Sequence, residues 1–320
     1  MTIKKWIQTT YPILERAGVS AARDELWLWL SLVTGKDRSY FSSRQNESIH
    51  DLLSNDARRS LEDILLRRLE REPLAYIRGS QEFWKRSFLV GRGVLIPRQD
   101  SERVIEAALS ILGLKRFPDL EPYALMSDHS HIRFMDLCTG TGCLGISLAE
   151  ELLHRNILFS GLLTDISDDA LYYARRNIYD SPAKDRIHVV RADLFPSQDE
   201  AGDILEKNRV HLIMANPPYI AAQEMEELMP EVKAYEPTIA LAGGEDGLTY
   251  YREILKRTDR YLLPGGYLIF EHGYDQGESV PELCREYGFD AVYSLRDYGG
   301  QPRVTVAGHN HPDDLLSTEE

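Results

Sequence analysis

Residues 132–149 read IRFMDLCTGTGCLGISLA, and this stretch decides the fold. The apolar run from Ile132 to Leu137 is typical of a buried strand, and the residues from Leu144 onward have the spacing of an apolar helix face. The glycines between them let the backbone approach a ligand without interference from a Cβ atom, and the start of the helix offers free N–H groups. We therefore expect a ligand site in this turn. The turn alone does not identify the ligand, because dinucleotide-binding folds and purely structural turns share it.

The pattern of a strand followed by a helix continues through the rest of the chain. Strands are expected at Arg133–Leu137, Leu158–Thr164, Arg186–Val190, Val210–Ala215, Tyr267–Glu271, Ala291–Leu295 and Arg303–Ala307. Helices are expected between them at Leu144–Leu153, Asp168–Ile178, Leu248–Leu262 and Gln276–Glu286. Apolar strands that alternate with helices of this length indicate βαβ units. The sequence therefore predicts an α/β domain with a seven-stranded, mostly parallel, Rossmann-like sheet.

The part of the chain before this domain has a different character. Residues 1–75 show helical spacing, which predicts a helix around Trp6–Leu14, a second over Ser20–Thr34 and a third that runs unbroken over Ile49–Arg71. The segment FWKRSFLVGRGVLIP (83–97) reads as a β-hairpin that turns around Gly91–Gly93, and a helix is expected over Ser101–Leu112. The predicted domains are a small all-helical domain (1–75), a β-hairpin linker (76–98), the α/β domain (99–308) and a polar C-terminal tail (309–320).

Composition narrows the class of partner. Of the 320 residues, 37 are Lys or Arg and 51 are Asp or Glu, so the net charge is 37 − 51 = −14. This charge argues against a surface that coats nucleic-acid phosphates, and it suits a basic protein partner. The 3 cysteines form no ligand-like pairs, and no run resembles a signal peptide or a membrane span, so we expect a cytoplasmic protein. Asp128, His129 and His131 fall short of a well-spaced set of metal ligands, and no metal is expected.

Two carboxylates follow the glycine-rich turn at the ends of the next two expected strands. Asp165 lies about 20 residues beyond the glycines, where a carboxylate can accept hydrogen bonds from both hydroxyls of a ribose. Its alternative role is that of a helix N-cap. Asp193 could accept a hydrogen bond from an adenine amino group. The turn lacks the Lys and Ser of a triphosphate-binding loop, and a dinucleotide stays possible. Two carboxylates without a phosphate clamp fit an adenosine without phosphates, such as S-adenosylmethionine.

A second motif, Asn216-Pro217-Pro218-Tyr219, directly follows the apolar strand VHLIMA (210–215). In an open α/β sheet the carboxyl end of this strand faces the same crevice as the glycine-rich turn. An amide nitrogen is a poor nucleophile, because its lone pair is delocalised. Two acceptors aimed at its N–H bonds, the Asn216 side-chain oxygen and the Pro217 carbonyl, would favour a tetrahedral nitrogen. The prolines stiffen the loop, Tyr219 can cover a planar target, and the alternative is an ordinary Asn-Pro turn.

Six segments together resemble the HemK/PrmC family of release factor glutamine methyltransferases, which belongs to the class I S-adenosylmethionine-dependent methyltransferases. These are REPLAYIRGSQEFW (71–84), VLIPRQDSE (94–102), DLCTGTGCLGISLA (136–149), NPPYI (216–220), EPTIALAGGEDGLTYY (236–251) and LLPGGYLIFEHGYDQG (262–277). The resemblance implies methyl transfer to the glutamine amide (N5) in the Gly-Gly-Gln motif of class I peptide chain release factors. It implies no metal, and a helical domain that holds the protein substrate.

Carried over residue by residue, the family's cofactor loop falls on Cys138, Thr139, Gly140, Thr141 and Gly142. Its ribose-binding acid falls on Asp165, and its adenine contacts fall on Asp193 and Leu194. Its substrate motif falls on Asn216, Pro217, Pro218 and Tyr219. Asn216 would also lie against the cofactor. Two departures stand out. Cys138 replaces the first glycine of the loop, and the segment Pro97–Glu102 lacks the second proline of the family pattern. The loop at 113–131 is also longer than usual in the family.

Three other functions are alternatives to this one. A sister family methylates a glutamine of a ribosomal protein, and NPPY motifs also occur in N6-adenine DNA methyltransferases, which would need a basic groove and a means of flipping the base. A non-enzymatic S-adenosylmethionine-binding regulator would have no reason to carry Asn216 beside the cofactor. The chain also contains its own Gly299-Gly300-Gln301, which we interpret as a turn between two strands rather than as a substrate.

Overall fold

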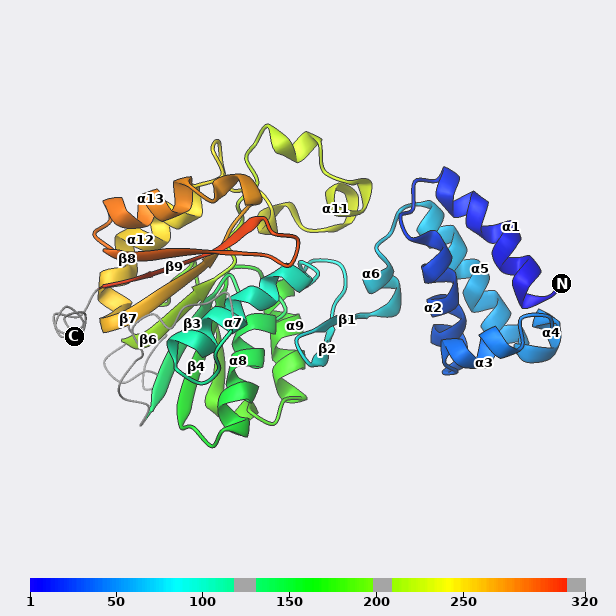
Figure 1. The fold of residues 1–320 in the computed structure, drawn as a ribbon, viewed down its shortest axis with the longest axis horizontal. Coiled ribbons are helices and arrows are strands. Elements are labelled where there is room, and N and C mark those ends of the chain that lie inside the picture. Colours follow the sequence, from blue (N-terminus) through cyan, green and yellow to red (C-terminus); the bar gives the residue numbers. More distant parts are fainter. Residues whose placement is uncertain (118–130, 198–208, 310–320) are drawn as a thin grey trace. The chain divides into compact units, whose positions relative to one another are not determined.

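The computed structural model of the chain describes residues 1–117, 131–197 and 209–309. Within these residues the main sheet has seven strands in the order β5-β4-β3-β6-β7-β9-β8 (Figure 1). Their bounds are β3 (Ile132–Leu137), β4 (Phe159–Asp165), β5 (Ile187–Arg191), β6 (Val210–Ala215), β7 (Leu262–Glu271), β8 (Ala291–Arg296) and β9 (Pro302–Gly308). The first five run parallel, and β9 is antiparallel to both of its neighbours. The predicted Rossmann-like sheet is confirmed.

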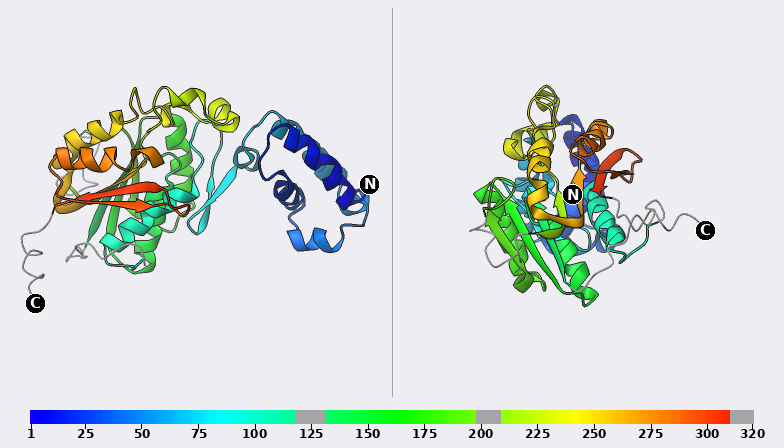
Figure 2. Two further views of the ribbon diagram at one scale, coloured as in Figure 1. Left: turned by 45° about the horizontal axis from the view of Figure 1, so that its top comes forward. Right: turned by 90° about the vertical axis from the view of Figure 1, so that its left-hand side faces the viewer.

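Helices cover both faces of this sheet (Figures 1 and 2). One face packs against α7 (Glu102–Ile111), α8 (Cys143–His154) and α9 (Asp168–Tyr179), and the other against α12 (Thr249–Tyr261) and α13 (Ser279–Glu286). Neighbouring residues of one strand therefore enter different cores: Phe134 lies in the first hydrophobic cluster and Met135 in the second. Burial on both faces explains why these strands read as continuous apolar runs.

The order of the strands creates a topological switch point. The chain proceeds from β3 outward to β4 and β5, then returns to the other side of β3 with β6 and β7. Ligands of open α/β sheets bind outside the carboxyl ends of the strands at such a point. The register pairs Leu137 with both Thr164 and Ala215, so the residues that follow these three strand positions emerge side by side.

A separate helical unit comprises Met1–Gly79 together with Met229–Tyr235. Its helices are α1 (Ile3–Arg16), α2 (Ala22–Thr34), α3 (Arg38–Ser43), α4 (Ile49–Leu52), α5 (Asn55–Leu69), α6 (Leu74–Arg78) and α11 (Pro230–Tyr235). The buried Arg68 of α5 makes two hydrogen bonds to the Glu25 carboxylate of α2, at 3.0 and 3.1 Å. Glu231 of α11 accepts a hydrogen bond of 2.7 Å from Arg71, so a segment that follows the NPPY motif in sequence belongs to this unit.

Two local predictions in this half of the chain are wrong. The single helix expected over 49–71 is two helices, because the Ser54 side chain accepts a hydrogen bond from the Ala57 N–H and starts α5. The hairpin turn expected at Gly91–Gly93 lies instead at Trp84 and Lys85, between β1 (Ser80–Phe83) and β2 (Arg86–Leu89). Trp84 adopts a φ of 53° there, a conformation that glycine usually provides.

The hairpin belongs to the unit that contains the sheet, and Asn177 of α9 anchors it. The Asn177 side chain accepts a hydrogen bond of 2.7 Å from the Leu89 N–H and donates one of 2.9 Å to the carbonyl of Thr141.

Across the described residues, none of the helices has both the length and the apolar character that a bilayer crossing requires.

Candidate active site

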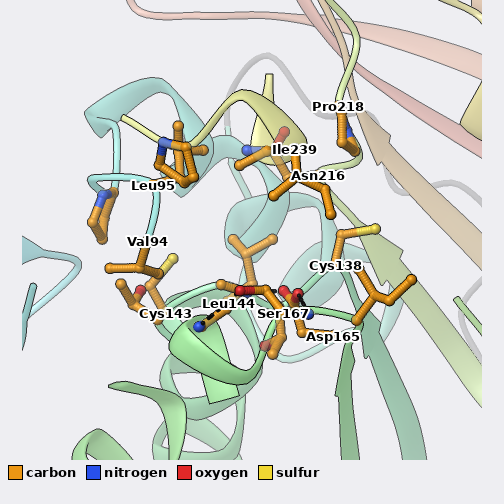
Figure 3. A pocket seen from close by; sticks show the side chains of 18 of the residues that line it. Val94, Leu95, Cys138, Cys143, Leu144, Asp165, Ser167, Asn216, Pro218 and Ile239 are labelled. Carbon is orange, nitrogen blue, oxygen red and sulfur yellow. Dashed lines mark hydrogen bonds between the residues drawn. The ribbon is translucent and has the colours of Figure 1, made fainter. Parts of the chain in front are cut away.

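A cavity opens at the switch point, outside the carboxyl ends of β3, β4 and β6 (Figure 3). Most of the predicted site residues line it, namely Cys138, Thr139, Gly140, Thr141, Asp165, Asp193, Leu194, Asn216 and Pro218. Three predicted residues, Gly142, Pro217 and Tyr219, do not line it. The strand register brings the two motifs together, because Cys138, Asp165 and Asn216 directly follow or end the three neighbouring strands.

The glycine-rich loop from Cys138 to Gly142 is held by Asp136, which is fully buried near the end of β3. One of its oxygens accepts hydrogen bonds from the Thr139 hydroxyl at 2.5 Å and from the Gly145 N–H at 2.9 Å. Burial raises the pKa of this carboxyl to about 7. Cys138 has a φ of 55°, where a side chain costs of the order of 1 kcal/mol relative to glycine. The glycine that the family usually places here thus has a conformational reason.

Asp165 ends β4 and faces the cavity. Its carboxylate accepts hydrogen bonds of 2.9 Å from the Gly140 N–H and from the Ser167 N–H. The helix N-cap of α9 is Ser167, whose hydroxyl accepts from the Ala170 N–H, so the alternative role of Asp165 as the cap is excluded. Burial raises the pKa of Asp165. Because these two N–H groups use only part of the carboxylate's capacity, its remaining lone pairs are free to accept hydrogen bonds from a ligand hydroxyl in the cavity.

Asp193 and Leu194, which follow β5, also line the cavity. Leu194 has a φ of 65°, and its carbonyl accepts a hydrogen bond of 2.6 Å from the Thr164 hydroxyl. The carbonyl of Asp193 accepts one of 3.2 Å from Arg257 of α12. Both backbone positions are therefore held in place from outside the cavity.

The NPPY loop is fastened through the backbone of Tyr219. The side chain of the buried Gln276, which ends η7 (Tyr274–Gln276), donates hydrogen bonds to the carbonyls of Tyr219 at 3.0 Å and Gly247 at 3.2 Å. Gly243 lies so close that a Cβ atom there would approach the Cα and carbonyl carbon of Tyr219 to 2.7 Å. The Tyr219 side chain packs against the second hydrophobic cluster, and burial raises its pKa to about 12. Tyr219 is therefore neutral at physiological pH.

Sequence reasoning missed a large part of the cavity wall. The residues concerned include Val94, Leu95, Pro97, Arg98, Ser101, Pro237, Ile239, Ala240 and Tyr250. The buried Glu236 joins two of these segments, because its carboxylate pairs with Arg98 and accepts a hydrogen bond of 3.1 Å from the Ile96 N–H. The motifs VLIPRQDSE and EPTIAL contain most of these residues and could have identified them. Tyr250, on α12, lies near the end of the longer segment EPTIALAGGEDGLTYY (236–251).

Two further sequence hypotheses concern metal binding and the chain's own Gly-Gly-Gln. Asp128 and His129 lie outside the described residues, and among the described residues no three acidic, His or Cys side chains form a group that could hold a metal. The Gly299–Gln301 segment is a turn between β8 and β9. The Asp297 carboxylate accepts hydrogen bonds of 2.9 Å from the N–H groups of Gly299 and Gln301, and the Asp297 N–H donates one of 2.7 Å to the Gln301 carbonyl.

Comparison with known proteins identifies the family. The PrmC N-terminal domain family matches residues 5–79, and the methyltransferase small domain family matches residues 123–233. A release factor glutamine methyltransferase of Clostridium acetobutylicum is 31% identical over 307 residues, which covers 96% of this chain and 98% of that relative. The chain belongs to the release factor glutamine methyltransferase family. It is therefore a methyltransferase, as its sequence motifs and fold predict.

Further relatives and one solved structure are also similar to this chain. A member from Geobacter sulfurreducens is 34% identical, with 95% of each chain covered. A bifunctional methyltransferase of Rickettsia typhi is 33% identical, but the chain spans only 56% of that relative's length. Among solved structures, the catalytic domain of hMettl16, determined with an RNA hairpin, has a TM-score of 0.51 at 18% identity, with 81% of each chain covered. This likeness concerns the fold alone.

Proposed function

We propose that the protein transfers a methyl group from S-adenosylmethionine to the side-chain amide nitrogen (N5) of the glutamine in the Gly-Gly-Gln motif of class I release factors, in the cytoplasm. The observation that carries this proposal is the position of Asn216 beside Cys138, in one cavity with Asp165. Membership of the release factor glutamine methyltransferase family supports a release factor as substrate. The helical unit, which matches the PrmC N-terminal domain, would hold that protein.

The chemistry of the cavity suits an adenosine without phosphates. Asp165 offers acceptors for ribose hydroxyls, and Gly140 allows a close backbone approach. Of the described residues that line the cavity, Arg98 alone is basic, and Glu236 already pairs with it. A triphosphate would thus find little compensating charge. S-adenosylmethionine, when bound, supplies a methyl group that its positively charged sulfur has already activated.

The residues of the chain then have two tasks: they position the target amide beside the methyl group, and they expose the lone pair of the amide nitrogen. The Asn216 side-chain oxygen and the Pro217 carbonyl would each accept one N–H of the target amide, which takes the nitrogen lone pair out of conjugation. Pro217 and Pro218 are buried, so the loop has little freedom to turn these acceptors away. No strong base is needed to start the reaction, because the amide nitrogen becomes acidic as the new bond to carbon forms.

The variant Asn216→Ala tests this role. We expect turnover to fall by about 10²-fold or more, the typical loss for one polar contact in a transition state. Affinity for S-adenosylhomocysteine should persist, because Asp165 and the glycine loop are unchanged. Asn156→Ala, an exposed position after α8 in the unit that contains the sheet, is the matched control and should turn over normally. Unimpaired turnover in Asn216→Ala would refute the proposed role and would favour a regulator that only binds the cofactor.

The substrate is tested by incubating the protein with S-adenosylmethionine and purified release factors, followed by mass spectrometry of tryptic peptides. We expect one methyl group on the glutamine of the Gly-Gly-Gln peptide. Ribosomal proteins and duplex DNA are incubated in parallel. Methylation of either one, with the release factor unmodified, would overturn the proposed substrate.

A further inference from the structure

A buried carboxyl group lies next to the proposed methylation site and has no part in the chemistry described so far. The register of β6 and β7 pairs Ala215 with Phe270, so the next residues along the two parallel strands, Asn216 and Glu271, leave the sheet side by side. The Glu271 side chain is 2% exposed. One of its oxygens, Oε2, has no hydrogen-bond partner, although burial of an unpaired carboxyl oxygen is costly.

Ser101 connects this carboxyl to the cavity. Ser101 lines the cavity with Asn216, and its hydroxyl lies close enough to the Glu271 carboxyl to lower the pKa of that group. Ser101 also occupies the N-cap position of α7, where a serine side chain normally accepts a backbone N–H. Here its side chain makes no such bond. The hydroxyl is therefore not used by the helix, and it lies near both the cavity and the buried acid.

The surroundings of Glu271 keep its protonated and ionised forms close in free energy. Burial raises the pKa of Glu271 to about 7, against the opposing effects of the Ser101 hydroxyl and two arginines. The charged and titratable groups that face it are Arg303 of β9, Arg98 and Asp100 before α7, Tyr219 of the NPPY loop, Tyr251 of α12 and Cys143 of α8. The nearby phenol of Tyr219 and thiol of Cys143, each with a pKa raised to about 12, are poor proton acceptors at neutral pH.

We propose that the Glu271 carboxylate accepts, through the Ser101 hydroxyl, the proton that the target amide nitrogen loses on methylation. The inference rests on the proposed function. The nitrogen lone pair forms the bond to the methyl carbon, and the sulfur keeps the electron pair of the bond that breaks. As the nitrogen becomes tetrahedral, one N–H turns from the Pro217 carbonyl to the Ser101 oxygen. Its proton passes to that oxygen while the Ser101 hydroxyl proton passes to Glu271. Glu271 becomes neutral, and after the products leave, its proton returns through Ser101 to solvent.

This relay addresses a need that Asn216 and Pro217 leave open. Their oxygens hold the target N–H bonds, but an amide oxygen is a very weak base and cannot keep the proton. The carboxylates that do line the cavity, Asp165 and Asp193, belong to the proposed ribose and adenine sites. A positioned acceptor with a pKa near the working pH typically accelerates such a step by about 10²- to 10⁴-fold.

The test uses Glu271→Gln and Ser101→Ala in the full-length chain, with a release factor as substrate. In the wild type, kcat should rise with pH and level off above about pH 7, with a solvent deuterium isotope effect above unity. In both variants kcat should fall by about 10²-fold or more. The rise of kcat with pH below about pH 7 (the acid limb) should disappear, together with most of the isotope effect. Affinity of Glu271→Gln for S-adenosylhomocysteine, measured by calorimetry, should stay unchanged, because Glu271 does not line the cavity.

Asp100→Asn is the matched control, since it makes the same chemical change in a carboxyl that faces Glu271. Removal of this negative charge should move the acid limb to lower pH without abolishing it, because Asp100 raises the pKa of Glu271. The inference is overturned if the wild type methylates the release factor and Glu271→Gln does so with the same kcat and pH profile. If Glu271→Gln fails to fold, Ser101→Ala decides. A wild type that leaves every release factor unmodified would refute the proposed function.

Discussion

Gln276 is the residue whose substitution most directly separates loop positioning from cofactor binding. Its side chain makes three hydrogen bonds: the amide nitrogen donates to Tyr219 and Gly247, and the amide oxygen accepts from the Gly273 N–H at 3.0 Å. The side chain is 5% exposed, so water cannot replace these partners. Gln276→Glu keeps the shape of the side chain and removes both donors.

The expected cost follows from the groups that lose their partners. Two carbonyls are left without a hydrogen bond, and each unsatisfied buried group costs about 1–3 kcal/mol. A carboxylate oxygen then faces the carbonyls of Tyr219 and Gly247, which adds repulsion. We expect the free energy of unfolding to fall by roughly 2–6 kcal/mol near neutral pH. The NPPY loop would lose its main support, and kcat should fall at least about 10-fold, because its acceptors no longer keep their position.

The assay combines chemical denaturation, calorimetry with S-adenosylhomocysteine and single-turnover methylation. Cofactor affinity should be retained, because the loop from Cys138 to Gly142 follows β3 and makes no hydrogen bond to the Gln276 side chain. The loss of stability should shrink at low pH, where the introduced carboxyl group becomes protonated and regains one donor. Gln8→Glu, on the exposed side of α1, is the matched control for stability and should leave the free energy of unfolding unchanged. Wild-type turnover together with wild-type stability in Gln276→Glu would refute the reasoning.

The cofactor site, the buried carboxyl and the chain's own Gly-Gly-Gln each give a further prediction. Asp165→Ala should weaken S-adenosylhomocysteine binding by about 10- to 100-fold in calorimetry, the value of one hydrogen bond to a charged group, and an unchanged affinity would exclude Asp165 from the ribose site. The pKa of Glu271 is raised from the ordinary 4.5 to about 7, so folding disfavours its ionised form, and stability is lost as the pH rises through 7. Glu271→Gln should therefore raise the free energy of unfolding by up to about 3 kcal/mol near pH 8 and by little near pH 4, whereas an equal effect at both pH values would argue against the shifted pKa. Gln301 should stay unmodified when the protein is incubated with S-adenosylmethionine alone, as intact-mass measurement can show, since both its N–H and its carbonyl are hydrogen-bonded to Asp297.

The parts of this protein that could be predicted from its sequence are those governed by short-range patterns. All seven expected strands are present in the sheet, because strands buried on both faces must be apolar throughout. Cys138, Asp165 and Asn216 could be placed in one site because parallel strands end at a common edge. The predictions that failed, the unbroken helix over 49–71 and the turn at Gly91–Gly93, depended on local competition. Ser54 interrupts an otherwise continuous helical pattern, and Trp84 takes a conformation that its residue type disfavours.

Contacts between residues far apart in the chain were decided only by the tertiary structure. Glu236 meets Ile96 and Arg98 across about 140 positions, and Gln276 supports Tyr219 from 57 positions away. The sequence shows each as an ordinary polar residue, since local spacing carries no information about long-range partners. Glu271 reads simply as the end of a strand, and only the register of β6 and β7 brings it beside Asn216. Burial there removes water from the carboxyl and changes its acidity, which no single-sequence pattern records.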